Sequence, residues 1–257
     1  MTLNHDAPKP YLHGTGPRVF AHRGLATAAP ENTLLAFANA LAAGASHVET
    51  DVQASSDGVA VICHDADLSR VASRTERVGQ LSFAELAAID LGDGQHIVSL
   101  ADALAAFPAT RFNIDVKDAA AVAPTAAAVL AAGATHRVLI TSFSERRRRE
   151  TTRLLPGVAS SASAPRFTLA LFAAKLGLSP VVRWALRGVS AVQVPQSAGP
   201  MRVTTPRVIR AMHRAGVEVH VWTVNEERDM SVLLDLGVDG LVTDRTDLAV
   251  PLIAARS

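Results

Sequence analysis

The segment "RVFAHRGLATAAPENTLLAFANALAAGASHVETDVQ", residues 18–53, contains the pattern that decides the fold. A short run of residues that favour strands is followed by a stretch rich in Ala and Leu, which is typical of a helix. Gly44 closes that stretch, as a helix C-cap does, and a second strand-like run follows. The segment therefore predicts a β–α–β unit.

The same alternation continues almost to the end of the chain. Strand-like runs separated by helical stretches occur at residues 18–22, 47–53, 111–117, 137–143, 158–163, 191–196, 218–224 and 240–244. Eight such units match the count of a (β/α)8 barrel, and 257 residues is a typical length for one. We therefore predict an α/β fold, a (β/α)8 TIM barrel.

One segment, residues 54–110, interrupts this rhythm. In it, "SSDG" followed by "VAVICHD" predicts a hairpin turn and a return strand, while "SFAELAAI" and "SLADALAAF" predict short helices. We expect a small insertion after strand 2, at about residues 54–98, on a single barrel domain that covers residues 18–257. Residues 1–17 are expected to form a flexible N-terminal tail.

Composition excludes several classes of protein. With 25 basic and 24 acidic residues the net charge is +1, so no global field indicates a nucleic acid partner. A single cysteine, Cys63, excludes an intramolecular disulfide and a thiolate metal cluster. Neither a secretory signal nor an apolar stretch long enough to cross a membrane is present, and we expect a soluble, cytoplasmic protein.

Polar residues alternate with apolar ones along two strands that should be buried and apolar in a parallel barrel. Glu49 and Asp51 share one face of "HVETDVQ", and Asp115 and Lys117 share one face of "RFNIDVK". In an arbitrary protein such alternation indicates an edge strand that is half exposed. A closed barrel has no edge, and a buried carboxylate needs a cation or hydrogen-bond donors, so here the pattern indicates a functional site.

These acids favour a hard cation. Glu49 and Asp51 lie roughly 6.6 Å apart along a strand, and Asp115 would add a carboxylate from the neighbouring strand. A set of oxygen ligands without thiolates or a nearby pair of histidines favours Mg²⁺ or Ca²⁺. Lys117 could hold an anionic oxygen near the metal, or it could form an ion pair with Asp115 or Glu49.

Two histidines complete the candidate site. His22 and Arg23 come at the carboxyl end of the first strand, where barrel enzymes place their chemistry, and His64 closes the hairpin strand. Cations for phosphoryl oxygens, together with one group that removes a proton and one that donates a proton, are what a phosphodiester centre needs. In "PENT", Glu31 and Asn32 could have a functional role or could only cap the following helix.

The chain resembles the glycerophosphodiester phosphodiesterase family from about residue 18 to residue 248. The resemblance rests on the motifs "AHRG", "PENT", "GASHVETDVQASSDGVAVICHD", "FNIDVK", "VHVWTVN" and "GVDGLVTD", which occur in the family's order and spacing. It implies a TIM barrel with a small insertion, and hydrolysis of a glycerophosphodiester to glycerol 3-phosphate and an alcohol.

The resemblance also implies roles for matching residues. His22 and His64 would be the acid and the base. Arg23 and Lys117 would hold the phosphate. Glu49, Asp51 and Asp115 would bind one divalent cation. The family usually has glutamate in place of Asp115. Trp222 resembles an aromatic residue that lines the family's site, although it could be ordinary core, as could Gln193. His220 is expected to be buried and hydrogen-bonded.

Two rival functions remain open. A lyase of the same fold that acts on lysophospholipids would leave a cyclic phosphate and use similar residues, and a non-catalytic protein could bind phosphodiesters. The sequence also leaves open whether water or a hydroxyl of the substrate is the nucleophile, which headgroup is preferred, and the oligomeric state.

Two regions outside the site could contact a partner. In "SERRRRETTRLL" the four consecutive arginines would point in different directions around a helix, which favours a solvated helix on the outside of the barrel. Residues 166–188 are largely apolar, with Lys175, Arg183 and Arg187 interspersed. They could form a helix pair packed on the barrel, or an apolar lid or lipid-facing surface beside the site.

Overall fold

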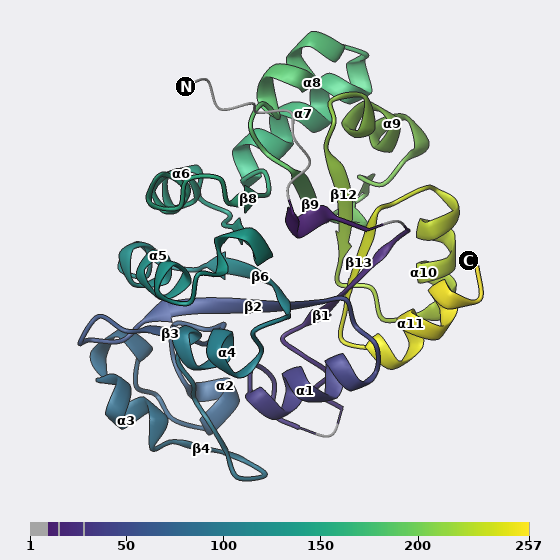
Figure 1. Cartoon of the computed structure of the whole chain (residues 1–257). Helices are drawn as coiled ribbons and strands as arrows, with labels where there is room; N and C mark the ends of the chain where they lie inside the picture. The colour runs from purple at the N-terminus through teal and green to yellow at the C-terminus, as the bar shows by residue number, and fades with distance from the viewer. Residues whose placement is uncertain (1–9, 15, 28, 257) are drawn as a thin grey trace.

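The computed structural model describes residues 10–14, 16–27 and 29–256 (Figure 1). Eight parallel strands of this part of the chain lie side by side in the order β8-β7-β6-β2-β1-β13-β12-β9. They are β1 (Arg18–His22), β2 (His47–Ala54), β6 (Arg111–Val116), β7 (Val138–Thr141), β8 (Ala159–Ser160), β9 (Ala191–Pro195), β12 (Glu218–Trp222) and β13 (Gly240–Thr243). Each lies within or against one of the predicted runs, so the predicted TIM barrel is confirmed.

The two ends of this sheet meet between β8 and β9. Ser161 forms a parallel bridge with Ala191, and the backbone N–H of Ala162 donates to the carbonyl of Ala191 at 2.9 Å. One residue earlier on each side, the backbone N–H of Ser190 donates to the carbonyl of Ser160 at 2.7 Å. These bonds bring the wall close to a complete cylinder.

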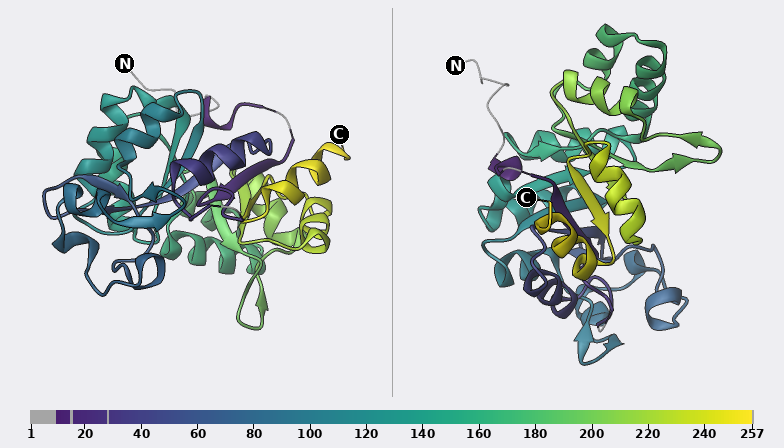
Figure 2. Two further views of the ribbon diagram at one scale, coloured as in Figure 1. Left: turned by 90° about the horizontal axis from the view of Figure 1, so that it is seen from below. Right: turned by 90° about the vertical axis from the view of Figure 1, so that its right-hand side faces the viewer.

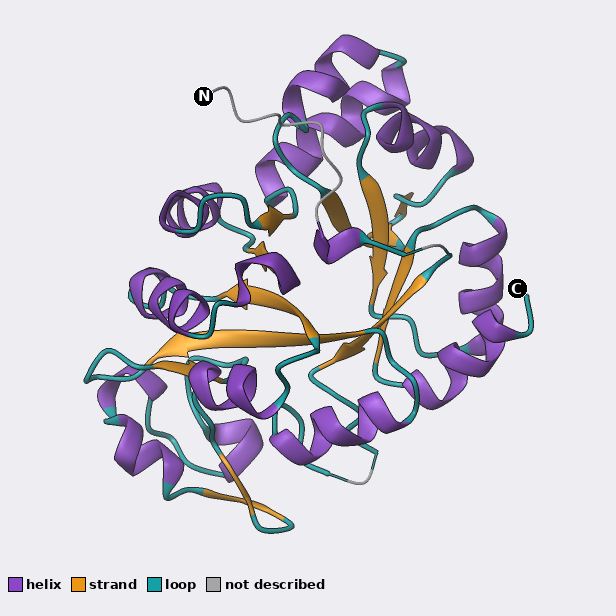
Figure 3. Ribbon diagram, viewed as in Figure 1, coloured by secondary structure: helices purple, strands orange, loops and turns teal. Residues whose placement is uncertain are grey.

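Helices surround the strands on the outside (Figure 3). They are α1 (Leu34–Ala42), α4 (Leu100–Ala106), α5 (Val122–Ala131), α6 (Glu145–Leu154), α7 (Ala164–Leu176), α8 (Ser179–Ala185), α9 (Pro206–Arg214), α10 (Glu227–Asp235) and α11 (Thr246–Ala254). Four of them begin at a Ser or Thr whose hydroxyl accepts a backbone N–H of the first turn: Thr33, Ser99, Ser144 and Thr205.

The segment between β2 and α4 forms a lobe beside the barrel. It contains β3 (Ala60–Ile62), α2 (Ser69–Ala72), η2 (Val78–Gln80), α3 (Phe83–Ala87), β4 (Asp90–Gly92) and β5 (Gln95–His96). The return strand predicted after "SSDG" is confirmed as β3, which runs antiparallel to β2 with Val52 opposite Ile62. The two predicted short helices are confirmed as α3 and α4.

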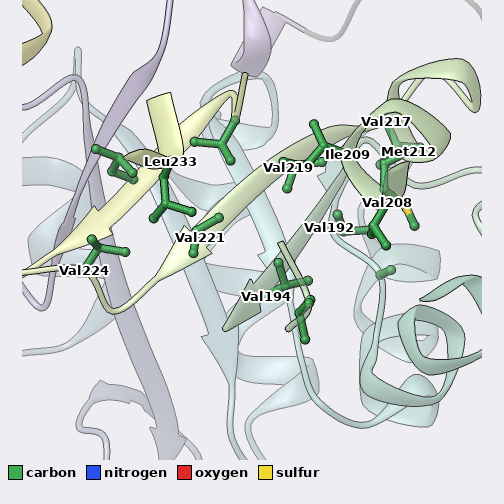
Figure 4. Close-up of a cluster of buried hydrophobic side chains, with 14 of the residues drawn as sticks. Val192, Val194, Val208, Ile209, Met212, Val217, Val219, Val221, Val224 and Leu233 are labelled. Carbon is green, nitrogen blue, oxygen red and sulfur yellow. The ribbon is translucent and has the colours of Figure 1, made fainter. Parts of the chain in front are cut away.

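Apolar side chains fill the space between the wall and the helices. Figure 4 shows valines of β9 and β12 packed against Val208, Ile209 and Met212 of α9. Inside the barrel, at the amino ends of the strands, Phe20 is fully buried. Gly240 makes room for it, because a Cβ there would lie 2.6 Å from the Phe20 ring.

The flexible tail predicted for residues 1–17 is wrong for its central part. Pro10–Leu12 form the short 3-10 helix η1, and Tyr11 is only 1% exposed. The Tyr11 ring packs edge-on against His47, with 5.0 Å between ring centroids, and closes the barrel floor. Burial of this ring anchors the segment. Residues 1–9 lie outside the described residues.

At the opposite end, a short hairpin follows β9 and projects beyond the barrel (Figure 2). Its strands are β10 (Ser197–Ala198) and β11 (Met201–Arg202). Among the described helices, none is both long enough and apolar enough to cross a membrane. The predicted cytoplasmic location stays a prediction.

Candidate functional site

A cavity of about 610 Å³ lies at the carboxyl ends of the barrel strands. One side is polar and charged, and the other is apolar. All the side chains predicted to form the site line this cavity: His22, Arg23, Glu49, Asp51, His64, Asp115, Lys117 and Trp222. The structure therefore brings together residues that are up to 200 positions apart in the sequence, while their individual roles stay predictions.

Sheet register places the three carboxylates. Asp51 of β2 lies directly opposite Asp115 of β6, and Glu49 lies opposite Asn113. Side chains at these alternate positions point to the same face of the sheet, which is the interior of the barrel. Glu49, Asp51 and Asp115 are 7%, 1% and 5% exposed, so the polar alternation read from the sequence marks a buried site rather than an exposed edge strand.

Two cations lie against these acids. The ammonium of Lys117 is 2.8 Å from Asp51 Oδ1 and 2.7 Å from Asp115 Oδ2, so the predicted ion pair with Asp115 is present and Asp51 takes the place expected for Glu49. Arg23 Nε lies 3.2 Å from Asp51 Oδ2. Burial alone would raise the pKa of Asp51, but the charges of Lys117 and Arg23 outweigh it and lower the pKa.

Glu49 is less well compensated. Burial, followed by the negative charge of Asp51, raises the pKa of Glu49 to about 8. Burial also raises the pKa of Asp115, although Lys117 opposes the shift. The site thus buries three carboxylates beside only two cations, Lys117 and Arg23, and the two positive charges do not fully compensate the negative charge.

This imbalance fits a divalent cation. Asp115 Oδ1 is buried without a hydrogen-bond partner, and the donors are carboxylate oxygens, which suit Mg²⁺ or Ca²⁺. In the described part of the chain, no three His, Cys, Asp or Glu side chains have the spacing of a formed metal site. Metal binding by Glu49, Asp51 and Asp115 therefore stays a prediction.

Arg23 depends on a tight turn after β1. Its φ is 59°, and its backbone N–H donates to the carbonyl of Glu49 at 3.0 Å, which holds this unfavourable conformation in place. At Gly24, φ is +88° and an added Cβ would lie 2.6 Å from the backbone of Ala36 in α1. The chain can make this close approach only with glycine, which explains the "HRG" pattern.

Each histidine is bonded to an aspartate. His22 Nδ1 is 2.6 Å from Asp244 Oδ1, and His64 Nδ1 is 2.7 Å from Asp65 Oδ1. In both rings this leaves Nε2 as the nitrogen for proton exchange with a ligand. Burial would lower the pKa of His22, but the bond to Asp244 and the charge of Glu49 outweigh it and raise the pKa.

Asp244 and Asn225 are site residues that sequence reasoning missed. Asn225 Nδ2 donates to Asp244 Oδ2 at 2.7 Å, and its Oδ1 accepts the backbone N–H of Asp244 at 2.9 Å. Asp244 is thus oriented toward His22. The signal was available, because both residues end the motifs "VHVWTVN" and "GVDGLVTD" at the carboxyl ends of β12 and β13.

The "PENT" motif has more than a capping role. Thr33 is the N-cap of α1, so capping by Glu31 or Asn32 is wrong. Asn32 Nδ2 donates to Asp51 Oδ2 at 3.3 Å, while its Oδ1 accepts from the Thr50 hydroxyl at 2.8 Å. Asn32 thus holds the side chains of two β2 residues in place, one of them a candidate metal ligand.

Glu31 connects the barrel to the lobe. It lies 3.1 Å from Arg23 and accepts two bonds of 2.8 Å from Arg70 of the lobe. Arg70 in turn donates to Asp65 at 2.7 Å, and Asp65 holds His64. This chain of charges fixes the lobe histidine relative to the barrel.

Three further residues singled out in the sequence lie in the cavity wall or behind it. Gln193 lines the cavity and accepts from Asn113 Nδ2 at 3.3 Å. His220 is fully buried, with its Nε2 3.0 Å from Glu218, so the expected buried and hydrogen-bonded histidine is confirmed. Trp222 lines the cavity wall and packs edge-on against Phe143, with 6.1 Å between ring centroids.

The apolar side of the cavity comes mainly from α7. Phe167, Leu171 and Phe172 of this helix line the cavity, opposite the carboxylates. Residues 166–188 contain most of α7 and all of α8, and these helices pack closely on each other, so the expected helix pair is present. It also forms one wall of the site.

Comparison with known proteins places this geometry in a family. The model of the glycerophosphoryl diester phosphodiesterase family matches residues 22–248. The probable glycerophosphodiester phosphodiesterase 2 of Mycobacterium tuberculosis is 42% identical over 96% of this chain and 94% of its own. A glycerophosphodiester phosphodiesterase of Caldanaerobacter subterraneus is 27% identical over 91% of this chain and 97% of its own.

Solved structures agree. The putative glycerophosphoryl diester phosphodiesterase of Silicibacter pomeroyi superposes with a TM-score of 0.80 at 25% identity, over 96% of each chain. The match covers the barrel, the lobe and the cavity-lining residues from His22 onward. The chain therefore belongs to the glycerophosphoryl diester phosphodiesterase family of enzymes.

Proposed function

We propose that this chain hydrolyses glycerophosphodiesters to glycerol 3-phosphate and an alcohol, using a divalent cation and two histidines. The observation that carries the proposal is that two imidazoles, each bonded to an aspartate, and three buried carboxylates line one cavity. Membership of the family and the names of the relatives support the choice of substrate.

The charged side of the cavity would hold the phosphate. Arg23 and Lys117 lie beside the carboxylates and would neutralise the phosphoryl oxygens as charge develops on them. Glu49, Asp51 and Asp115 would hold Mg²⁺ or Ca²⁺. When bound, the cation would supply Lewis-acid stabilisation of the same oxygens.

The two histidines would exchange protons with substrate. One would take a proton from the nucleophile, which is water or a hydroxyl of the substrate's glycerol, and the other would donate a proton to the leaving alcohol. Where the glycerol hydroxyl attacks, water then opens the cyclic phosphate to give glycerol 3-phosphate. Asp244 and Asp65 would act as positioning residues, because each holds Nδ1 of its histidine, so that Nε2 is the nitrogen that would exchange the proton. The bond to the leaving oxygen breaks as its proton arrives, so no unstable alkoxide is released.

The test is turnover by metal-free protein. Protein treated with a chelator is assayed on glycerophosphocholine, glycerophosphoethanolamine and glycerophosphoglycerol, with Mg²⁺, Ca²⁺ or Mn²⁺ added back. We expect turnover to fall roughly 100-fold on chelation and to return with at least one metal, because metal stabilisation contributes several kcal/mol. Glu49→Gln should prevent recovery.

Product analysis by ³¹P NMR separates the rival functions. A glycerol 3-phosphate signal as the first product supports hydrolysis, whereas a persistent cyclic phosphate would identify a lyase. Saturable binding of every substrate without turnover, in the presence of each metal, would identify a non-catalytic binding protein and overturn the proposal.

A further inference from the structure

The outer face of α7 carries an apolar stripe. Leu169, Phe172 and Leu176 lie three and four positions apart, so they share one side of the helix, and they are 42%, 51% and 72% exposed. Leu178, just after the helix, is 47% exposed, and Phe143 on the neighbouring rim is 58% exposed. We call these five residues the rim stripe. Clustered exposed apolar residues of this kind are typical of an interaction surface.

An arginine-rich groove of about 650 Å³ runs beside the rim stripe, between α6, α7 and α8. Its basic lining residues are Arg148, Arg149, Arg153, Arg166 and Arg187. Arg148 is paired with Glu145, and Arg166 donates to the carbonyls of Ala185 and Arg187. In the described part of the chain, no carboxylate pairs with Arg149, Arg153 or Arg187.

The arginine run in the sequence does not form this groove by itself. The side chains of residues 146–149 diverge around α6, as expected: Arg146 pairs with Glu150, and Arg147 turns inward to Ser142. A solvated helix is therefore wrong for part of the run. The packing of α7 and α8 against α6 adds Arg166 and Arg187 and makes the local patch basic.

The rim stripe links this groove to the catalytic cavity. Leu169 lines the groove, and Phe172, one turn further along α7, lines the cavity. Trp184 also lines the groove and is 69% exposed. Apolar and aromatic side chains bordered by unpaired arginines are what an interfacial helix presents to lipid headgroups.

We propose that the rim stripe and the arginine groove dock this protein on an anionic lipid bilayer, with the cavity mouth at the membrane surface. Charge favours this occupant over a second copy of the chain. A symmetric dimer through this face would bring the unpaired arginines of both copies together, and that repulsion opposes association. With a net charge of only +1, the attraction to a bilayer would come from this face rather than from the protein as a whole.

The experiment is co-sedimentation with vesicles of phosphatidylcholine alone or of phosphatidylcholine containing phosphatidylglycerol. The full chain should bind the anionic vesicles and release as salt is raised, while binding to the neutral vesicles is weak. Arg149→Ala with Arg153→Ala should weaken binding about fivefold for each arginine. Arg146→Ala is the matched control, since it lies on the same helix outside the groove.

A second pair of variants tests the apolar part. Leu169→Asp with Leu176→Asp should abolish vesicle binding, while Leu130→Asp on α5, 54% exposed, should not. Neither double variant touches the charged side of the cavity, so hydrolysis of glycerophosphocholine should persist. Equal binding to both vesicle types, or binding unchanged in both double variants, would overturn the proposal. So would a dimer in light scattering that the Leu169→Asp and Leu176→Asp changes dissociate.

Discussion

The two sides of the cavity are built in different ways. On the charged side, strands β1, β2 and β6 hold side chains in fixed register, and the acids are tied to Lys117, Arg23 and Asn32. On the apolar side, α7 contributes rings that make no hydrogen bonds, and Phe172 is half exposed. Reaction chemistry needs fixed positions, whereas recognition of an alcohol or a lipid surface needs only complementary area.

If this contrast is correct, loss of a histidine has the largest effect. His22→Asn or His64→Asn should reduce kcat roughly 1000-fold with little change in KM, because proton transfer is lost while Arg23 and Lys117, the cations proposed to bind the phosphate, remain. Steady-state kinetics on glycerophosphocholine measures this. His136→Asn, outside the cavity, should be neutral. A kcat within tenfold of that of the parent for both site variants would contradict the idea that the charged side of the cavity performs the chemistry.

Loss of Lys117 should affect stability as well as catalysis. Lys117→Met leaves Asp51 and Asp115 buried beside each other without their shared cation, and we expect a loss of about 3 kcal/mol in the free energy of unfolding without added metal. Urea denaturation in the presence of a chelator measures it. The loss should shrink as pH falls, because the carboxyls then take up protons. Lys175→Met, which removes a partly exposed lysine outside the cavity that bonds only to the carbonyl of Arg202 among the described residues, is the control, and an equal loss there would contradict this account.

Asp244→Asn should have a smaller effect on rate, about 10- to 100-fold in kcat, because the imidazole remains. Asp244 raises the pKa of His22 in the folded state. Protonated His22 therefore stabilises the fold at pH below its unfolded pKa, and this contribution disappears as pH rises through the folded pKa. The variant should lower the pKa of His22, which NMR titration of the imidazole measures.

The same variant should destabilise the protein more in acid than in alkali, since the protonated imidazole gains more from Asp244 than the neutral ring does. Asp239→Asn is a matched control, because Asp239 lies 2.7 Å from His213 outside the cavity. It should leave kcat unchanged. An unaltered pKa of His22 in Asp244→Asn would show that the pair does not position or tune the histidine.

The apolar side should show the smallest effect, and it should fall on KM. Phe172→Ala removes part of an aromatic wall, and we expect KM to rise about fivefold for a glycerophosphodiester with an apolar alcohol. Hydrolysis of glycerophosphocholine should change less, and kcat should stay the same for both. Leu176→Ala, on the same helix but outside the cavity, is the control. A fall in kcat instead would mean that α7 takes part in the chemistry.

The sequence by itself determined the barrel and most of the charged side of the cavity. Alternation of strand-like and helical runs is a local signal, and so is the two-residue period that placed Glu49, Asp51 and Asp115 on the interior face. The carboxyl ends of parallel barrel strands meet at one end, so His22 and Lys117 could be assigned to the same site.

Only the tertiary structure decided which of these groups pair. The bond from His22 to Asp244 joins residues 222 positions apart, and Arg70 reaches Glu31 across the contact between lobe and barrel. The basic groove likewise needs arginines from α6, from α7 and from the turn after α8, and the sequence did not show that packing brings them together. Periodicity reports the face on which a side chain lies, but a hydrogen bond depends on the distance between elements, which closure of the barrel sets.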